Sequence, residues 1–393
     1  MTLYFDNPFQ HDSLEYGVQQ RSALDPDDAS SARQSLRSWD VYEPTPLLDA
    51  GGLAGRLGVD SIWIKDEASR KPLKSFKSLG GAYALMVALS ERIAEKTGEK
   101  PSISDLANHK FSSLIKGNRI VATTDGNHGR SLAWGAQLFG VPCTIFVPKN
   151  VSEGRKEPIR ALGADVVTFD GNYDQTMEHC AKEAAKHNWV HIQDTSHEGF
   201  TRWHRVIMEG YTLMVEEAFS QFPDDQKPTH MFLQVGCGGM AAAIVAHMVV
   251  TWGVAKLPKT ILVQSEAVDP LVQSFAKGTD QIDMGDHNTA LVGIACGEVA
   301  SLAKDLLYPY ADGAMTVKDD DALSLMREAA QGELTGAPFI MGETGASGLA
   351  AAVTACQDQK LRERLSIDAT SRIFVVSSEG DTDPEFYKSV IEA

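Results

Sequence analysis

The chain of 393 residues is 43% hydrophobic and 23% charged, a composition typical of a globular protein that buries a large core. Its 53 acidic and 36 basic residues give a formal net charge of −17, which argues against non-specific binding to nucleic acid or anionic lipid. The length suggests two domains, since one domain usually takes about 100–200 residues.

The five cysteines are odd in number and widely spaced, without a CxxC pair, so we expect reduced thiols in a cytoplasmic protein. The N-terminus lacks a basic segment followed by an apolar run, so no signal peptide is expected. The longest apolar stretch, Met240 to Ala255, is shorter than the roughly 20 residues that span a bilayer. We therefore expect a buried helix there and no membrane partner.

Residues 1–40 are polar and are expected to form an arm or a short helix on the surface. Beyond them, short β-rich segments alternate with stretches of helical periodicity, which indicates mainly parallel sheets flanked by helices. Strands are expected at 61–67, 119–123, 142–147, 165–169, 189–193, 231–235, 260–265 and 372–377. Helices are expected at 80–96, 129–139, 152–162, 173–187, 240–250 and 349–355. The rhythm fits a small domain at 90–215 inserted into a larger one formed by 1–89 and 216–393.

Lys77 lies in Ser75-Phe76-Lys77-Ser78, at an expected strand-to-helix transition. A lysine that forms an imine must lose its charge near neutral pH, and burial or a neighbouring positive charge can achieve this. The alternative is a surface lysine at a helix start, like the nearby Lys71 and Lys74.

A glycine-rich segment at 236–240 lies between an expected strand and an expected helix. Backbone N–H groups and the helix N-terminus at such a turn favour an anion such as a phosphate. The segment also satisfies a loosened dinucleotide fingerprint, with Glu266 near the position of a ribose-binding acid, so a nicotinamide-dependent oxidoreductase is an alternative. That fingerprint usually opens a nucleotide domain, whereas about 230 residues precede it here. The alternative also leaves Lys77 and Asn127 without a role.

Two polar segments follow expected strands. Residues 124–129 lie between a strand and a helix, where Asp125 or Asn127 could cap the helix, and capping can coexist with binding a carboxylate. Asp194 ends a strand at the expected domain junction, where α/β sheets place ligands. The alternative for Asp194 is an ordinary turn residue at a strand end.

Ser378 ends the last expected strand and is followed by Glu379-Gly380-Asp381. The order of lysine, polar turn, glycine turn and late serine resembles that of the fold type II pyridoxal-phosphate enzymes, the tryptophan synthase β and threonine dehydratase group. The resemblance covers about residues 44–384. It implies an α/β fold of two domains, each with a central, mainly parallel sheet flanked by helices, with pyridoxal 5′-phosphate as cofactor and a homodimeric assembly.

The resemblance also implies a role for each motif. Lys77, beside Phe76, would hold the cofactor covalently. Asn127 would hydrogen-bond the cofactor's phenolic oxygen, and Ser378 its pyridine nitrogen. The cofactor's phosphate would lie against Gly236, Cys237, Gly238, Gly239 and Met240. The carboxylate of a small amino-acid substrate would bind at Thr124, Asp125, Gly126 and His128.

Within this group, the segments 75–81, 124–129, 194–195 and 378–384 are more similar to the diaminopropionate ammonia-lyase family than to any dehydratase. Dehydratase-like members carry a small uncharged residue at the position of Asp125. The implied reaction is the α,β-elimination of D- or L-2,3-diaminopropionate to pyruvate and two ammonia. Lys77 would take the Cα proton of the L isomer, Asp125 that of the D isomer, and Asp194 would hold the substrate's amino group. A serine or threonine dehydratase of the same fold is the alternative, and a cofactor-binding regulatory protein without turnover is a further one.

Other polar clusters carry weaker signals. His179, Cys180, His187 and His191 match no common metal-ligand spacing, so no metal is expected. His197, Arg202 and His204 are expected to form a polar face near the domain junction. The small-residue segment Gly342–Gly348 is expected to be a turn before a helix, and its role is open.

Overall fold

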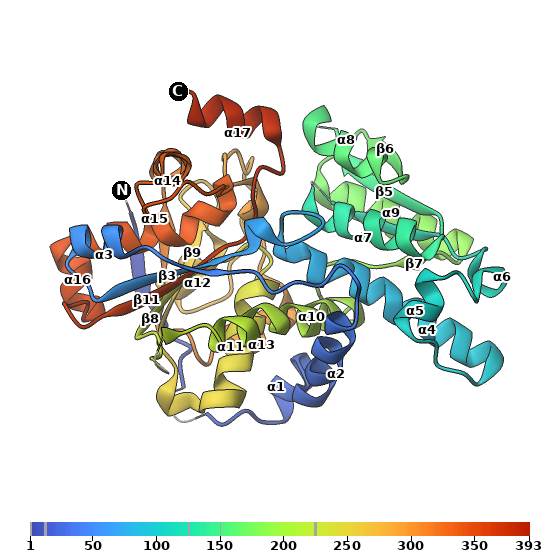
Figure 1. Cartoon of the computed structure of the whole chain (residues 1–393), viewed down its shortest axis with the longest axis horizontal. Helices are drawn as coiled ribbons and strands as arrows, with labels where there is room; N and C mark the ends of the chain where they lie inside the picture. The colour runs from blue at the N-terminus through green and yellow to red at the C-terminus, as the bar shows by residue number, and fades with distance from the viewer. Residues whose placement is uncertain (1, 12–13, 125, 150, 224–225) are drawn as a thin grey trace.

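The computed structural model describes residues 2–11, 14–124, 126–149, 151–223 and 226–393. The strands in this part of the chain form a seven-stranded sheet and a four-stranded sheet. Figure 1 shows the larger sheet on one side of the molecule, the smaller sheet on the other, and helix α10 (Arg202–Phe219) where the two parts meet.

The larger sheet has the order β1-β10-β9-β8-β11-β3-β2. Its five inner strands are parallel, and the short strands β1 and β2 pair antiparallel at its two edges. The strands are β1 (Tyr4–Asp6), β2 (Leu47–Asp49), β3 (Ser61–Asp66), β8 (His230–Gln234), β9 (Lys259–Ser265), β10 (Gly313–Val317) and β11 (Arg372–Ser377).

Both faces of the larger sheet are covered, as expected for buried parallel strands. Successive side chains of a strand point to opposite faces, so Met231 and Leu233 join one core and Phe232 the other. The first core includes residues of α10, α11 (Gly239–Trp252) and α13 (Ser301–Leu307). The second includes residues of α3 (Gly51–Leu57), α14 (Asp319–Gln331) and α15 (Glu343–Gln357).

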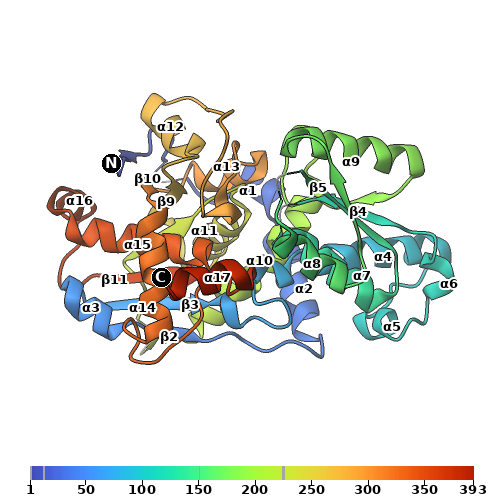
Figure 2. The ribbon, with the colours of Figure 1, turned by 90° about the horizontal axis from the view of Figure 1, so that it is seen from above.

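The smaller sheet has four parallel strands in the order β6-β5-β4-β7. These are β4 (Ile120–Thr123), β5 (Cys143–Pro148), β6 (Asp165–Phe169) and β7 (Val190–His191). Right-handed crossovers place α7 (Asn127–Phe139) and α8 (Glu153–Ala161) on one face and α9 (Tyr173–His187) on the other (Figure 2). Helix α4 (Gly81–Thr97) packs on α7.

The remaining helices lie around these layers. They are α1 (Val18–Ala23), α2 (Pro26–Arg37), α5 (Ile103–Ala107), α6 (Ser112–Ile115), α12 (Pro270–Lys277), α16 (Gln359–Leu365) and α17 (Pro384–Ile391). Single-turn 3₁₀ helices include η1 (Glu67–Ser69) and η2 (Phe76–Leu79).

The expected fold class is confirmed, and each expected strand is present with ends shifted by a few residues. Two expectations are wrong. The first 40 residues are not a surface arm, because β1 joins the larger sheet and α2 buries Ala29, Ala32 and Leu36. Gly342–Gly348 is not a turn, because α15 begins at Glu343 and its small residues pack closely on β8 and β11.

The division into domains at residues 90 and 215 stays a proposal. It is supported by the smaller sheet, all of whose strands lie between these limits.

Helix α11 occupies most of the apolar stretch, and its ten residues from Met240 to Val249 are buried. It packs against α10 and α13 inside the protein. Across the described ranges, none of the helices combines the length and the apolar character needed to span a lipid bilayer.

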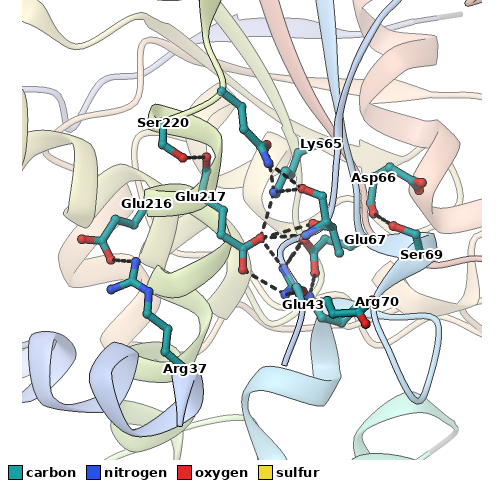
Figure 3. Close-up of polar contacts among 12 residues, drawn as sticks. Arg37, Glu43, Lys65, Asp66, Glu67, Ser69, Arg70, Glu216, Glu217 and Ser220 are labelled. Carbon is teal, nitrogen blue, oxygen red and sulfur yellow. Dashed lines mark hydrogen bonds and ion pairs between the residues drawn. The ribbon is translucent and has the colours of Figure 1, made fainter. Parts of the chain in front are cut away.

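A cluster of four buried charges fastens α10 to the larger sheet (Figure 3). The carboxylate of Glu217, near the end of α10, accepts from Lys65 Nζ at 2.9 Å and from two Arg70 nitrogens at 2.8 and 2.9 Å. Arg70 also donates two hydrogen bonds to Glu67, at 2.7 and 2.8 Å. Each of these side chains is at most 3% exposed. Two cations and two anions cancel, so each charge is tolerated only while its partners remain.

We expect Glu217→Ala to destabilise the protein by about 3–5 kcal/mol, because it leaves Lys65 and Arg70 buried without a full complement of anions. Glu216, the preceding residue, is the matched control, because its carboxylate is 35% exposed and pairs with Arg33 and Arg37. Glu216→Ala should cost about 1 kcal/mol or less. Urea unfolding of both variants measures the difference, and equal losses would contradict the assignment of the buried cluster.

Candidate active site

Lys77 lies in η2, which is held between the end of β11 and helix α10. The Phe76 N–H donates to the Ser378 carbonyl at 3.1 Å, and Ser75 forms a β-bridge with Glu379. On the other side, the rings of Phe76 and Tyr211 contact at a centroid distance of 4.7 Å. The larger sheet and α10 therefore fix the backbone from which the lysine projects.

The Lys77 ammonium forms a very short contact with the Asp194 carboxylate, which follows β7 of the smaller sheet. Burial alone would lower the pKa of Lys77, but the Asp194 carboxylate outweighs it and raises that pKa. Burial likewise opposes ionisation of Asp194, yet the charges of His128 and Lys77 lower its pKa. The burial that could neutralise Lys77 is therefore present, but it is opposed by the Asp194 carboxylate, and the role of Lys77 toward a cofactor stays a prediction.

The polar turn at 124–129 lies beside this pair, at the start of α7. Thr124 and His128 are buried, and the Thr124 hydroxyl accepts from the Gly126 N–H at 3.0 Å. His128 Nδ1 lies 3.9 Å from an Asp194 oxygen, and its Nε2 contacts the Ile192 carbonyl at 3.0 Å. Gly126, with no side chain, is the N-cap of α7, so Asn127 does not occupy the cap position. Asp125 lies outside the described residues.

Asn127 connects the turn to the larger sheet. Its side-chain amide donates a very short hydrogen bond to Glu379, and its oxygen accepts from Arg130 at 3.1 Å. Nearby, Arg155 of α8 donates to Glu343 of α15 at 2.8 Å. Burial, and after it the charge of Glu379, raises the pKa of Glu343 to about 7. Glu343, at the start of α15, and Glu379, which follows β11, are thus two buried carboxylates on the side of the larger sheet. Their partners, Arg155 and Asn127, belong to helices that cover the smaller sheet.

The glycine turn between β8 and α11 is built from glycines whose surroundings leave no space for a side chain. Gly238 has φ +91°, a conformation that favours glycine, and it caps the N-terminus of α11. A Cβ on Gly239 would lie 2.7 Å from His204 Nε2, so this position also tolerates no side chain. Met240 is buried and Cys237 is partly exposed, with its sulfur 3.2 Å from that of Cys296. The turn therefore presents backbone rather than side chains to whatever binds there.

The residues present fit pyridoxal 5′-phosphate. Lys77 supplies an amine that is 23% exposed, and the glycine turn supplies an anion site at a helix N-terminus. The Asn127 amide donates to Glu379, and Glu379 forms a β-bridge with Ser75, two residues before the lysine. The carbonyl of the buried Ser378 accepts from the N–H of Phe76, the residue next to the lysine. The roles expected for Phe76, Asn127 and Ser378 toward a cofactor stay predictions.

Sequence reasoning missed several residues of this site. Tyr211 is buried beside Lys77, and burial raises the pKa of its phenol. His204 does not lie on a polar face with His197 and Arg202, because it is 1% exposed whereas they are exposed. Its spacing from Lys77 carried no signal, since the two meet only after folding. The histidines at 179 and 187 stack on Phe169 and Trp189, and within the described ranges no group of three potential ligands is placed to hold a metal ion.

The Lys77–Asp194 pair predicts a pH-dependent contribution to the stability of the cofactor-free protein. The folded pKa of Asp194 is lowered, so its contribution is present above the unfolded value of about 3.9 and is lost as pH falls. That of Lys77 is raised, so its contribution is present below about 10.4 and is lost as pH rises through the folded value. Asp194→Asn should therefore cost about 1–3 kcal/mol at pH 7 and clearly less at pH 3. Thermal unfolding at both pH values tests this, with Asp381→Asn, which breaks the exposed pair with Lys74, as the control. A loss that does not change with pH would contradict it.

Comparison with known proteins agrees with this geometry. The family model described as pyridoxal-phosphate dependent enzyme matches residues 39–379. Diaminopropionate ammonia-lyase from Escherichia coli K12 is 35% identical over 92% of this chain and 91% of its own length. The holo crystal structure of the Escherichia coli enzyme superposes with a TM-score of 0.89 at 32% identity, covering 100% of this chain and 96% of that one. A second structure of that enzyme, in complex with an aminoacrylate-PLP azomethine reaction intermediate, has a TM-score of 0.87 at 31% identity and covers 100% and 97%. The chain therefore belongs to the pyridoxal-phosphate-dependent enzymes and, among them, to the diaminopropionate ammonia-lyase family.

Proposed function

We propose that this chain catalyses the α,β-elimination of 2,3-diaminopropionate to pyruvate and two ammonia. The observation that carries the proposal is the pairing of the Lys77 ammonium with Asp194 beside the polar turn at the start of α7. A carboxylate that holds the ammonium of Lys77 can hold the ammonium of a substrate in the same place. Family membership supplies the reaction class.

Pyridoxal phosphate, when bound, supplies the electron sink that makes the Cα proton of an amino acid acidic. We assign the attachment of this cofactor to Lys77 Nζ. Asn127 would donate to its phenolic oxygen with the amide hydrogen that Glu379 does not take. Ser378 would bond its pyridine nitrogen, and the glycine turn at 236–240 its phosphate. These groups suit such a cofactor, because an amine can bond to its aldehyde, while an amide and backbone N–H groups can donate to its oxygens.

Asp194 would bind a substrate ammonium once Lys77 no longer occupies it. Bonded to the cofactor, the Lys77 nitrogen would keep at most one of its three N–H groups, so the largely buried Asp194 carboxylate would be free to accept from a new ammonium. The N–H groups of the turn, with Thr124 and His128 around them, would bind the substrate's carboxylate. Both ends of a small amino acid are then fixed before a proton moves.

Two bases would let one site accept both enantiomers. Lys77 would take the Cα proton of the L isomer, and Asp125, on the turn that follows β4, that of the D isomer. The assignment of Asp125 comes from its position in the sequence motif, between the described residues Thr124 and Gly126. A positioned general base typically contributes about 10²–10⁴-fold to the rate.

A serine or threonine dehydratase of the same fold is the alternative. A hydroxyl leaving group carries no charge, so a dehydratase has no need of a second carboxylate for a second ammonium. The acidic pair Asp125 and Asp194 therefore favours a diamino acid as substrate. The nicotinamide alternative conflicts with membership of the pyridoxal-phosphate-dependent enzymes. It also leaves Lys77 and Asn127 without the roles proposed for them here.

We also propose a homodimer that works in the cytoplasm. The homodimer rests on the resemblance to fold type II enzymes. The five cysteines, all in the described part of the chain, are thiols, which suits a reducing compartment.

Lys77→Ala should abolish the borohydride-trapped link between protein and cofactor, because no other amine is expected to take its place. Turnover should fall to the limit of detection. Mass spectrometry of the reduced protein, with and without pyridoxal phosphate, measures the link directly. Lys74→Ala is the control, since that lysine is 53% exposed and pairs with Asp381. A variant at 77 that is still labelled would show that another lysine is the anchor.

Asp125→Asn separates the lyase from the dehydratase. It keeps the size of the side chain but removes the base, so turnover of D-diaminopropionate should fall by about 10²–10⁴-fold. The L isomer, served by Lys77, should lose less, and cofactor attachment should be unchanged. Steady-state rates with both enantiomers and with L-serine, on wild type and variant, decide the matter. A wild type that prefers serine would refute the lyase, whereas equal losses on both enantiomers would refute only the division between Lys77 and Asp125.

A further inference from the structure

His204 connects the glycine turn to the lysine end of the site. It lies in the first turn of α10, and its side chain is nine-tenths or more buried. Its Nε2 reaches the first residue of α11, 2.7 Å from the place that a Cβ of Gly239 would take. The imidazole thus lies against the glycine turn at the N-terminus of α11, a kind of position that favours an anion.

The neighbours of His204 determine which ring nitrogen carries the proton. Its Nδ1 lies 3.0 Å from the Ser196 hydroxyl oxygen. That oxygen already accepts from the Leu302 N–H at 3.1 Å and from the Ser301 hydroxyl at 3.2 Å. The one hydrogen of Ser196 is therefore left to donate to Nδ1. In a neutral imidazole with Nδ1 as acceptor, Nε2 carries the hydrogen and is a donor.

The neutral form is the one expected at neutral pH. Burial lowers the pKa of His204 to about 4, and the nearby Lys77 charge acts in the same direction, although Asp194 opposes both. The ring therefore presents an uncharged N–H to the glycine turn. It can donate a hydrogen bond there but cannot act as a fixed cation.

In the described part of the chain, this donor has no acceptor. Among the described residues, none lies within hydrogen-bond distance of His204 Nε2, although the atom is fully buried. Buried donors are nearly always satisfied, because leaving one unpaired costs folding free energy. His230, by contrast, is bonded at both nitrogens, at 2.8 and 2.9 Å. His191 Nε2 is also unpaired among the described residues, but only the His204 nitrogen lies against a glycine of the turn. The geometry at Gly239 indicates that an oxyanion is the missing acceptor.

We propose that His204 is a phosphate-binding residue whose Nε2–H donates to an oxygen of the cofactor phosphate held at the glycine turn. This inference rests on the proposed function only in taking that phosphate to be the one of pyridoxal phosphate. Ser196 is then a positioning residue, because its hydroxyl keeps Nδ1 as the acceptor. The first turns of α10, α11 and α13 converge on one phosphate.

The test compares pyridoxal phosphate with pyridoxal, which can bond to Lys77 but has no phosphate. Spectrophotometric titration of the cofactor-free protein gives both dissociation constants without reference to turnover. His204→Leu should weaken pyridoxal phosphate by about 10- to 100-fold, the range for a hydrogen bond to a charged group, and leave pyridoxal unchanged. His204→Gln, which keeps an N–H donor, should recover part of the loss.

His247→Leu is the matched control. It removes another buried histidine from α11, roughly 12 Å along the helix from Gly239, where the ring stacks on Phe219 at 5.3 Å. The ratio of the two dissociation constants should stay at the wild-type value in this variant. Ser196→Ala supplies a second measurement if His204→Leu does not fold, because a freed Nδ1 should weaken the phosphate ligand and spare pyridoxal.

Equal weakening of both ligands in the His204 and Ser196 variants would show a merely structural role and overturn the inference. An unchanged ratio in His204→Leu would overturn it as well. Failure of the proposed function looks different: the wild type would bind pyridoxal phosphate with the expected preference over pyridoxal but release no ammonia from diaminopropionate. The inference on His204 would stand in that case.

Discussion

The buried contact between Glu217 and the two cations Lys65 and Arg70 is the constraint on which the rest of the site depends. It joins the end of α10 to β3 and to the segment that runs into η2, which carries Lys77. Helix α10 itself carries Tyr211 and His204, so the lysine and the residues around it are placed by one rigid unit. Removing any of the charges would leave an uncompensated ion in the core, and this cost keeps the unit together.

The site forms where the carboxyl ends of strands from both sheets meet, which is where α/β folds place ligands. The polar contacts that cross this junction in the described part of the chain include Lys77 with Asp194, Asn127 with Glu379, and Arg155 with Glu343. In each of these contacts, one residue belongs to the part of the chain that contains the larger sheet, and the other to the part that contains the smaller sheet. The polar groups at such a junction also hold the two parts of the molecule together. A ligand that replaces one of these contacts therefore binds to one part and removes a link to the other. The exchange that we propose, of the Lys77 ammonium for a substrate ammonium on Asp194, is one example.

The chain has a net charge of −17, yet it has a glycine turn at a helix N-terminus, a feature that favours an anion. On our proposal, a phosphate there would be bound by backbone N–H groups, the N-terminus of α11 and the neutral N–H of His204. Neutral donors suit a site only a short distance from Lys77, because another cation there would compete for Asp194. The acidic composition and the anion site are therefore compatible, since local dipoles rather than net charge decide what binds.

The alternation of strands and helices, the lysine segment and the glycine turn could be predicted from the sequence because each depends on local periodicity or on residues adjacent in the chain. The resemblance to a family added the order of the motifs. Several features could not be predicted. The charge of Lys77 depends on Asp194, 117 residues away, and the burial and tautomer of His204 depend on Ser196, Ser301 and Leu302. Likewise, the start of α15 at Glu343 depends on packing against β8 and β11, which lets small residues that look like a turn form a helix. The sequence by itself determined which elements form and which chemical groups they carry. Only the tertiary structure decided which of those groups meet, and hence their charge and hydrogen bonding, because burial and long-range partners set both.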